Sequence, residues 1–156
     1  LVSSLISAPA YGWKYFEDLK ANKTAVPGAN AQALNPVLQG AKSVVVGAVD
    51  YIALTAQAKG EKIEVIYPAS GTVVEARPAM ILKSSKNVAH AQKFIDYMLS
   101  DEGQQQVANT LMLPARTDVA AKRLGWNDIK VLQVKAIGEQ ERTDTLAKFK
   151  TTLGLK

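Results

Sequence analysis

Apolar residues recur at helical spacing in several stretches of the chain, most clearly after Asn87. They fall at i, i+3, i+4, i+7 and i+8: Ala91, Phe94, Ile95, Met98 and Leu99. This spacing predicts an amphipathic helix, and Asn87 is a suitable N-cap. Ser100 then precedes a second short helix whose first residues are acidic. Similar patterns predict further helices over residues 11–23, 30–40, 50–60 and 139–150.

Shorter apolar stretches between these helices predict strands. Residues 43–49 form a nearly continuous run rich in valine, which is typical of a strand buried on both faces. Residues 62–68 alternate and end at a proline, and residues 73–82 are a third candidate with Pro78 at an edge or a start. A further apolar run covers 129–134. Because strands alternate with helices, the predicted fold class is α/β.

Composition narrows the class of protein. The chain has 156 residues, of which 47% are hydrophobic and 21% charged, as in a globular domain. Nineteen basic and fourteen acidic residues give a net charge of +5, with the lysines scattered rather than clustered. This favours a solvated basic surface over a nucleic-acid partner. No apolar run approaches the length of a membrane span, and Leu1 opens no recognisable signal peptide.

The residue inventory gives no support to catalysis. Cysteine is absent, which excludes disulfides and thiol chemistry, and a site with two imidazoles is excluded by a single histidine, His90. His90 and Asp96 are six positions apart on one predicted helix, so they do not meet as neighbours. No phosphate-binding loop, nucleophile elbow or dinucleotide fingerprint is present. We therefore expect neither an enzyme nor a bound cofactor or metal.

Three runs of sequence carry a resemblance to a known family. They are AKGEKIEVIYPASGT (58–72), KSSKNVAHAQKFIDYMLSDEGQQQVAN (83–109) and LPARTDV (113–119). In this order and spacing they resemble the C-terminal part of periplasmic solute-binding proteins of ABC importers. The resemblance is to the iron(III)-type and organophosphate-type members of the type II periplasmic binding proteins, which have two lobes.

The resemblance implies a domain organisation. Residues 1–68 correspond to the C-terminal part of the second lobe, and residues 69–156 return to the first lobe and end in C-terminal helices. The N-terminal half of such a protein has no counterpart in this sequence. We therefore expect part of a two-lobed fold, with a change of lobe near residues 67–74, where PASGT predicts a turn.

Members of this family hold their solute between the lobes with loops and helix N-termini, which suit anions. The matching positions here are Asn30, Asp50, Tyr51, Ser70, Gly71 and Thr72. Each also has a purely structural interpretation. Asn30 and Asp50 are possible helix caps, Tyr51 a core residue, and the last three a turn.

The sequence departs from iron-binding members of the family at the position of their tyrosine pair. Those proteins place two adjacent tyrosines after the strand, and here only Tyr51 follows Asp50. An acceptor at Asp50 suits a solute that also carries a hydroxyl or ammonium group. The expected solute is a small polar anion, such as a phosphorylated sugar or an aminophosphonate, with ferric iron as the alternative.

The resemblance also implies partners and location. The partners are the small anionic solute and the membrane subunits of an ABC importer, in the periplasm or outside the cell with a lipid anchor. An alternative of another class is a self-assembling structural domain. If the valine-rich strand predicted at 43–49 has an exposed edge, it would pair with the missing N-terminal half of the fold. Alternatively, it would exchange with the same strand of a second copy.

Overall fold

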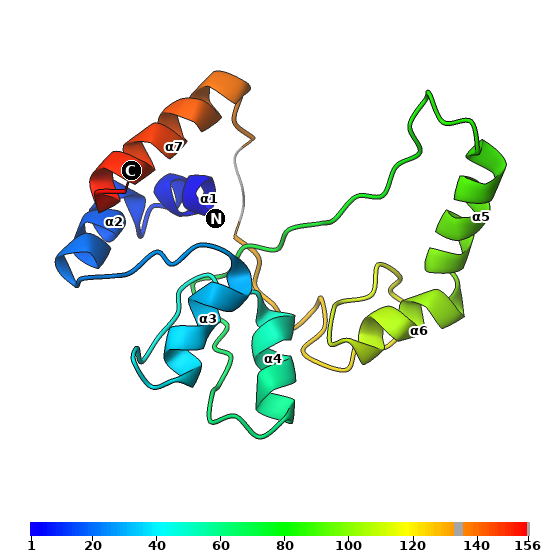
Figure 1. Cartoon of the computed structure of the whole chain (residues 1–156), viewed down its shortest axis with the longest axis horizontal. Coiled ribbons are helices and arrows are strands. Elements are labelled where there is room, and N and C mark those ends of the chain that lie inside the picture. Colours follow the sequence, from blue (N-terminus) through cyan, green and yellow to red (C-terminus); the bar gives the residue numbers. More distant parts are fainter. Residues whose placement is uncertain (133–135, 156) are drawn as a thin grey trace. The chain divides into compact units, whose positions relative to one another are not determined.

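The structure is a computed structural model that describes residues 1–132 and 136–155. These residues contain seven helices (Figure 1). They are α1 (Val2–Ser7), α2 (Gly12–Ala21), α3 (Asn30–Leu38), α4 (Asp50–Ala58), α5 (Val88–Met98), α6 (Asp101–Asn109) and α7 (Glu139–Leu153). Every helix that the sequence predicts is present, with ends that differ by a few residues.

Contacts divide the chain into two compact units. Unit 1 comprises Leu1–Gly47, Pro68–Val74 and Lys130–Lys156, and unit 2 comprises Ala48–Tyr67 and Glu75–Ile129. The proposed lobes, 1–68 and 69–156, are a different division of the chain and stay a prediction.

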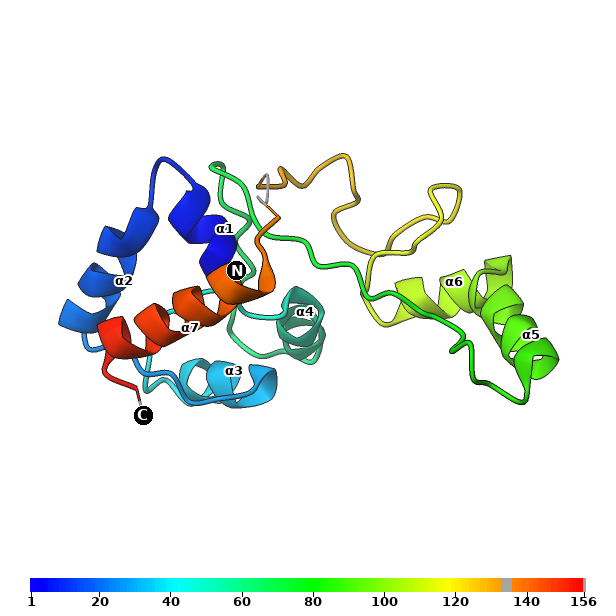
Figure 2. The same ribbon diagram turned by 90° about the horizontal axis from the view of Figure 1, so that it is seen from above.

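Aromatic packing holds unit 1 together. Phe16 of α2 is only 4% exposed, and its ring lies 5.4 Å from that of Phe149 of α7 in an edge-to-face arrangement. The Lys148 ammonium lies 4.5 Å from the centre of the Trp13 ring. Helices α1, α2 and α7 therefore lie against one another, as Figure 2 shows.

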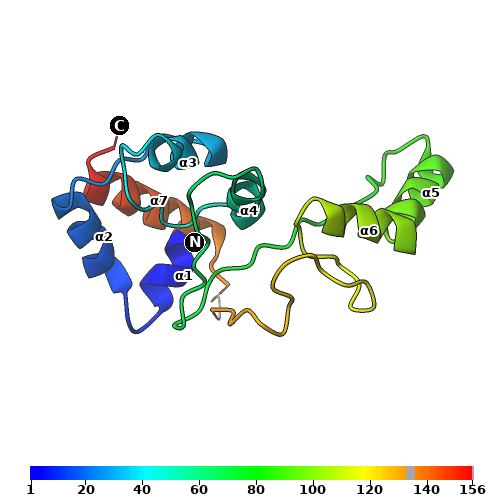
Figure 3. The same cartoon turned by 90° about the horizontal axis from the view of Figure 1, so that it is seen from below.

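Helices α5 and α6 pack together in unit 2, and their junction is capped as predicted. The Ser100 hydroxyl accepts a hydrogen bond from the Gly103 N–H at 3.1 Å. Asn87 is the N-cap residue of α5, but its side chain makes no capping hydrogen bond. Figure 3 shows the two helices side by side at the end of a long extended segment.

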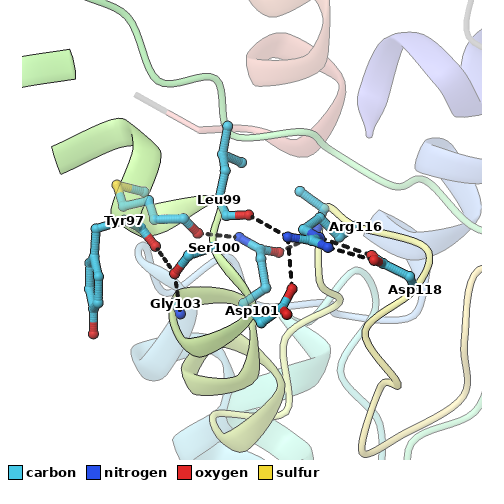
Figure 4. A network of polar contacts seen from close by, with 10 residues as sticks. Tyr97, Leu99, Ser100, Asp101, Gly103, Arg116 and Asp118 are labelled. Atoms are coloured by element: carbon cyan, nitrogen blue, oxygen red, sulfur yellow. Dashed lines mark hydrogen bonds and ion pairs between the residues drawn. The ribbon is translucent and has the colours of Figure 1, made fainter. Parts of the chain in front are cut away.

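Arg116 ties the α5–α6 junction to the loop that follows. Its guanidinium forms ion pairs with Asp101 at 2.8 Å and with Asp118, and donates to the Leu99 carbonyl at 3.2 Å (Figure 4). Gln104, 4% exposed, adds a second link through its side-chain amide. Its Nε2 donates to the Met98 carbonyl at 2.7 Å, and its Oε1 accepts from the Ala115 N–H at 2.6 Å.

The structure corrects the prediction of strands. Over residues 43–49, 62–68 and 73–82 the described chain forms no strand, and an isolated parallel bridge joins Thr72 to Val131. A strand requires hydrogen bonds from a neighbouring strand, and these extended segments have no ladder partner among the described residues. Val44, expected to be buried, is 74% exposed. The helical half of the α/β prediction is thus confirmed, whereas residues 1–132 and 136–155 contain no sheet.

The fourth apolar run falls partly outside the described residues. Of residues 129–134, Gln133 and Val134 are not described. Ile129 is buried, and Val131 contributes to the bridge with Thr72.

Gln104→Leu tests the link between α6 and the loop. The substitution keeps a good helix former but leaves the Met98 carbonyl and the Ala115 N–H without their partner. Both groups are near the surface, where water partly replaces the lost bonds. We expect a loss of about 1 to 2 kcal/mol in unfolding free energy, seen as a fall of about 2 to 8 °C in melting temperature. The exposed neighbour substitution Gln105→Leu should leave the melting temperature nearly unchanged; equal effects would contradict this role for Gln104.

Candidate ligand-binding site

Asp50 starts helix α4 and is one of the residues that the sequence singles out. It is the first helical residue, with Val49 at the N-cap, and its Oδ1 accepts from the Tyr51 N–H at 2.8 Å. A carboxylate in the first turn is favoured by the helix dipole and satisfies one of the unpaired N–H groups. The side chain therefore has a local structural role, which leaves its second oxygen available to other partners.

That second oxygen is shared by two side chains from distant parts of unit 2. The Tyr67 hydroxyl donates to Asp50 Oδ2 at 3.2 Å, and Arg123 forms an ion pair with the same oxygen. Arg123 also donates to the Tyr67 hydroxyl and, through Nη1, to the Leu111 carbonyl at 3.4 Å. Its guanidinium carbon lies 5.5 Å from the centre of the Tyr67 ring. Asp50, Tyr67 and Arg123 thus form one connected cluster, here called the Arg123 cluster.

Burial changes the pKa values of two ionisable groups in this cluster, Asp50 and Tyr67. The Arg123 side chain is 4% exposed, whereas that of Asp50 is half-buried. Burial raises the pKa of the Asp50 carboxyl, but the hydrogen bond and charge of Arg123 outweigh it, so this pKa lies below its ordinary value. Burial and the neighbouring Asp50 charge raise the pKa of Tyr67. At neutral pH the cluster therefore holds a carboxylate, a neutral phenol and a guanidinium.

One donor of Arg123 remains unused. The buried Nε has no hydrogen-bond partner among the described residues. An unpaired buried donor costs about 1 to 3 kcal/mol, so its presence is itself a structural signal. Arg123 also lines a cavity of about 420 Å³ in unit 2, together with Lys122 and Tyr67. A cationic group beside a cavity is suited to hold an anion.

Tyr51, the other residue singled out in this unit, contacts the cluster through its backbone N–H, whereas its side chain makes a different contact. Its ring faces the Arg77 guanidinium, whose carbon is 5.6 Å from the ring centre. Its carbonyl accepts from the Thr55 hydroxyl at 2.7 Å. Tyr51 is half-buried, and its contacts are those of a packing residue.

Asn30 lies in unit 1 as the first residue of α3 and is exposed. The N-cap position belongs to Ala29, so Asn30 is not the cap that the sequence suggests. Gln32 supplies the missing side-chain contact, since its Oε1 accepts from the Ala29 N–H at 3.1 Å.

Ser70, Gly71 and Thr72 form the turn that their composition predicts. The Gly71 N–H donates to the Pro68 carbonyl at 2.8 Å, and its φ of +113° requires glycine. The Ser70 hydroxyl lies 2.6 Å from that of Tyr11. Thr72 exchanges backbone hydrogen bonds of 2.9 and 2.8 Å with Lys130 and Leu132. This turn belongs to unit 1, so its described contacts are separate from those of the Arg123 cluster.

The sequence thus finds one of the three members of the cluster. Asp50 stands out because it follows an apolar run and begins a helix. Tyr67 and Arg123 have no comparable signal, since they lie 17 and 73 positions from Asp50, on the edge of a predicted strand and in a loop. Only the folded chain brings them together.

Comparison with known proteins assigns the chain to a family. The sequence profile of the bacterial extracellular solute-binding proteins matches residues 10–133, which is most of the chain. The chain belongs to this family. Its role is therefore solute binding in transport, outside the cytoplasm, with a small molecule and a transporter as the general kinds of partner. No solved structure matches the chain.

Two further findings concern the described residues alone. None of their helices is long and apolar enough to cross a membrane. They also hold no group of three or more histidine, cysteine, aspartate or glutamate side chains that could bind a metal ion.

Asp50→Asn tests the Arg123 cluster. The folded-state pKa of Asp50 lies below its value in the unfolded chain, near 3.9. Its stabilising effect is therefore present above about pH 4 and disappears as the pH falls through the folded-state value. At pH 7 we expect the substitution to lower unfolding free energy by about 1 to 3 kcal/mol. By pH 3 the difference from the unsubstituted protein should shrink.

Denaturant unfolding at pH 7 and pH 3 measures both differences. Asp96→Asn is the matched control, because Asp96 is an exposed carboxylate of the same unit with no ion pair in the described chain. A loss for Asp50→Asn that is the same at both pH values would show that the ion pair does not contribute.

Proposed function

We propose that this protein is the extracytoplasmic solute-binding component of an ABC importer and binds a small polar anionic solute. The solute belongs to the class of phosphorylated sugars and aminophosphonates. Family membership supports the transport role, and the Arg123 cluster supports an anion. The membrane subunits of the importer are the protein partners, and the protein works in the periplasm or, lipid-anchored, at the cell surface.

The buried guanidinium is the observation that carries the choice of an anion. Arginine presents a planar set of donors that matches the oxygens of phosphate and carboxylate groups. In this cluster Asp50 and Tyr67 hold the guanidinium in place, and Lys122 lines the adjoining cavity. The positive charge is therefore fixed in position before a solute arrives, which reduces the ordering that binding must provide.

The same geometry argues against ferric iron as the solute. The Asp50 oxygen that faces the cluster is already paired with a guanidinium, which would repel a trivalent cation. Tyr51, the tyrosine at the position of the iron-binding pair, faces the Arg77 guanidinium. The Asp50 carboxylate and the Tyr51 ring thus each lie near an arginine.

The domain assignment and the remaining site residues belong to the same proposal. Residues 1–68 and 69–156 are assigned to the second and first lobes by the resemblance to two-lobed solute-binding proteins; the two compact units divide the chain differently. Asn30 and the turn 70–72, which belong to unit 1, are also proposed as ligand-binding residues. The exposed hydroxyl of Ser70 and the exposed side chain of Asn30 are in keeping with this role.

A second candidate, self-association, is favoured by one observation. Helix α5 buries none of its residues, and its apolar face is exposed; Phe94, for example, is 62% exposed. Apolar residues also stand exposed on the extended segment before it: Met80 and Leu82. Such a surface is an association site, either for a second copy or for a further part of a longer polypeptide.

Calorimetric titration tests the proposed solute. A sugar phosphate and an aminophosphonate are titrated into the protein, with ferric citrate as the competing hypothesis. We expect saturable binding of at least one anion and at least a tenfold loss of affinity in Arg123→Lys, which keeps the charge but loses the planar donors.

Arg116→Lys is the matched control, because Arg116 also forms ion pairs in unit 2 but does not line the cavity. Its affinity for the anion should be unchanged. Tight binding of iron without a response to either anion would overturn the proposal.

A further inference from the structure

Part of the wall of the unit 2 cavity consists of residues outside the Arg123 cluster. Its volume of about 420 Å³ is within the range of small-molecule sites. Leu54 of α4 lines one part, and Val65, Leu111 and Leu124 line others. Four large aliphatic side chains therefore face a space whose polar lining residues are Gln57, Tyr67, Lys122 and Arg123.

The charge of this space is unbalanced. Arg123 is paired with Asp50, whereas Lys122 is exposed and has no ion-pair partner in residues 1–132 and 136–155. The cavity therefore carries one positive charge in excess, at its exposed edge. The side chain of Arg123, 4% exposed and with its Nε unpartnered, places a second cation behind that edge. An anionic group at Lys122 would be attracted by this excess charge.

The aliphatic wall restricts what the rest of the solute can be. Hydroxyl groups placed against Leu54, Val65, Leu111 and Leu124 would lose their bonds to water without gaining partners. A hydrocarbon chain would instead remove apolar surface from water on both sides of the contact. The wall thus suits an alkyl chain better than a polyhydroxylated ring.

We propose that the cavity binds the hydrocarbon chain of an organic anion whose charged group lies at Lys122, over the buried Arg123. The inference rests on the proposed solute-binding function and narrows its solute class toward alkyl-bearing anions. A phosphonate and a carboxylate share the chemistry that the site recognises, so both kinds of charged group are tested.

Chain length is the decisive variable in the experiment. Methyl-, butyl- and hexylphosphonate, and in parallel acetate, butanoate and hexanoate, are titrated calorimetrically into the protein. Affinity should rise by about three- to fourfold for each methylene that enters the cavity. The series with the lower dissociation constants identifies the preferred charged group.

Two substitutions separate the contribution of the solute's charged group to binding from that of its hydrocarbon chain. Lys122→Gln should weaken binding of every anion by a similar factor, because it removes the charge at the edge. Leu124→Ser, at a residue 48% exposed and so tolerant of change, should reduce only the advantage of the longer chains. Lys93→Gln and Leu82→Ser are the matched controls in the same unit, and both should bind as the unsubstituted protein does.

The outcomes distinguish this inference from the function on which it rests. Anion binding that is independent of chain length, or unaffected by Leu124→Ser, overturns the hydrocarbon site and leaves the solute-binding proposal standing. If none of these anions, nor the sugar phosphate and aminophosphonate, binds at all, both proposals fall. The inference is supported if affinity rises with chain length, Lys122→Gln weakens every anion by a similar factor, and Leu124→Ser reduces only the advantage of the longer chains.

Discussion

A guanidinium that is almost completely buried constrains unit 2 more than any other single group. Arginine cannot lose its charge, so burial obliges the chain to bring partners to it. Asp50, Tyr67 and the Leu111 carbonyl meet this requirement from three separate segments. The start of α4, the segment before the turn at Pro68 and the loop after α6 are thereby joined. The same charge lowers the pKa of Asp50, and Lys122 gives the cavity beside the pair its excess positive charge.

Structure that depends on neighbours in sequence could be predicted, and structure that depends on distant partners could not. Helices α5 and α6 follow from apolar spacing and from the Ser100 cap, both of which act within a few residues. The turn at Gly71 likewise follows from composition. The run at 43–49 indicates burial on two faces, but a strand forms only when another segment supplies its hydrogen bonds. No such segment pairs with it in the described chain.

The candidate site shows the same division at the level of single residues. Asp50 could be found because its role begins with its own helix, where it accepts from the next N–H. Arg123 could not, since nothing near it in sequence marks it as different from the chain's other basic residues. Its importance arises from a contact that spans 73 positions. Nor could the sequence distinguish Tyr51 from Tyr67, although only the latter joins the cluster.

Helix α5 and the predicted strands differ in how their backbone hydrogen bonds are satisfied. A helix satisfies its backbone hydrogen bonds within its own turns, so the backbone of α5 needs no partner segment although Phe94 on its apolar face stays exposed. A strand cannot do this, so residues 43–49 and 73–82 form no strand in the described chain. The residues that match the solute-binding family include both kinds of segment. The apolar pattern of these residues is therefore one of burial, and it calls for apolar cover over α5 and for hydrogen-bonding partners along the segments without a ladder.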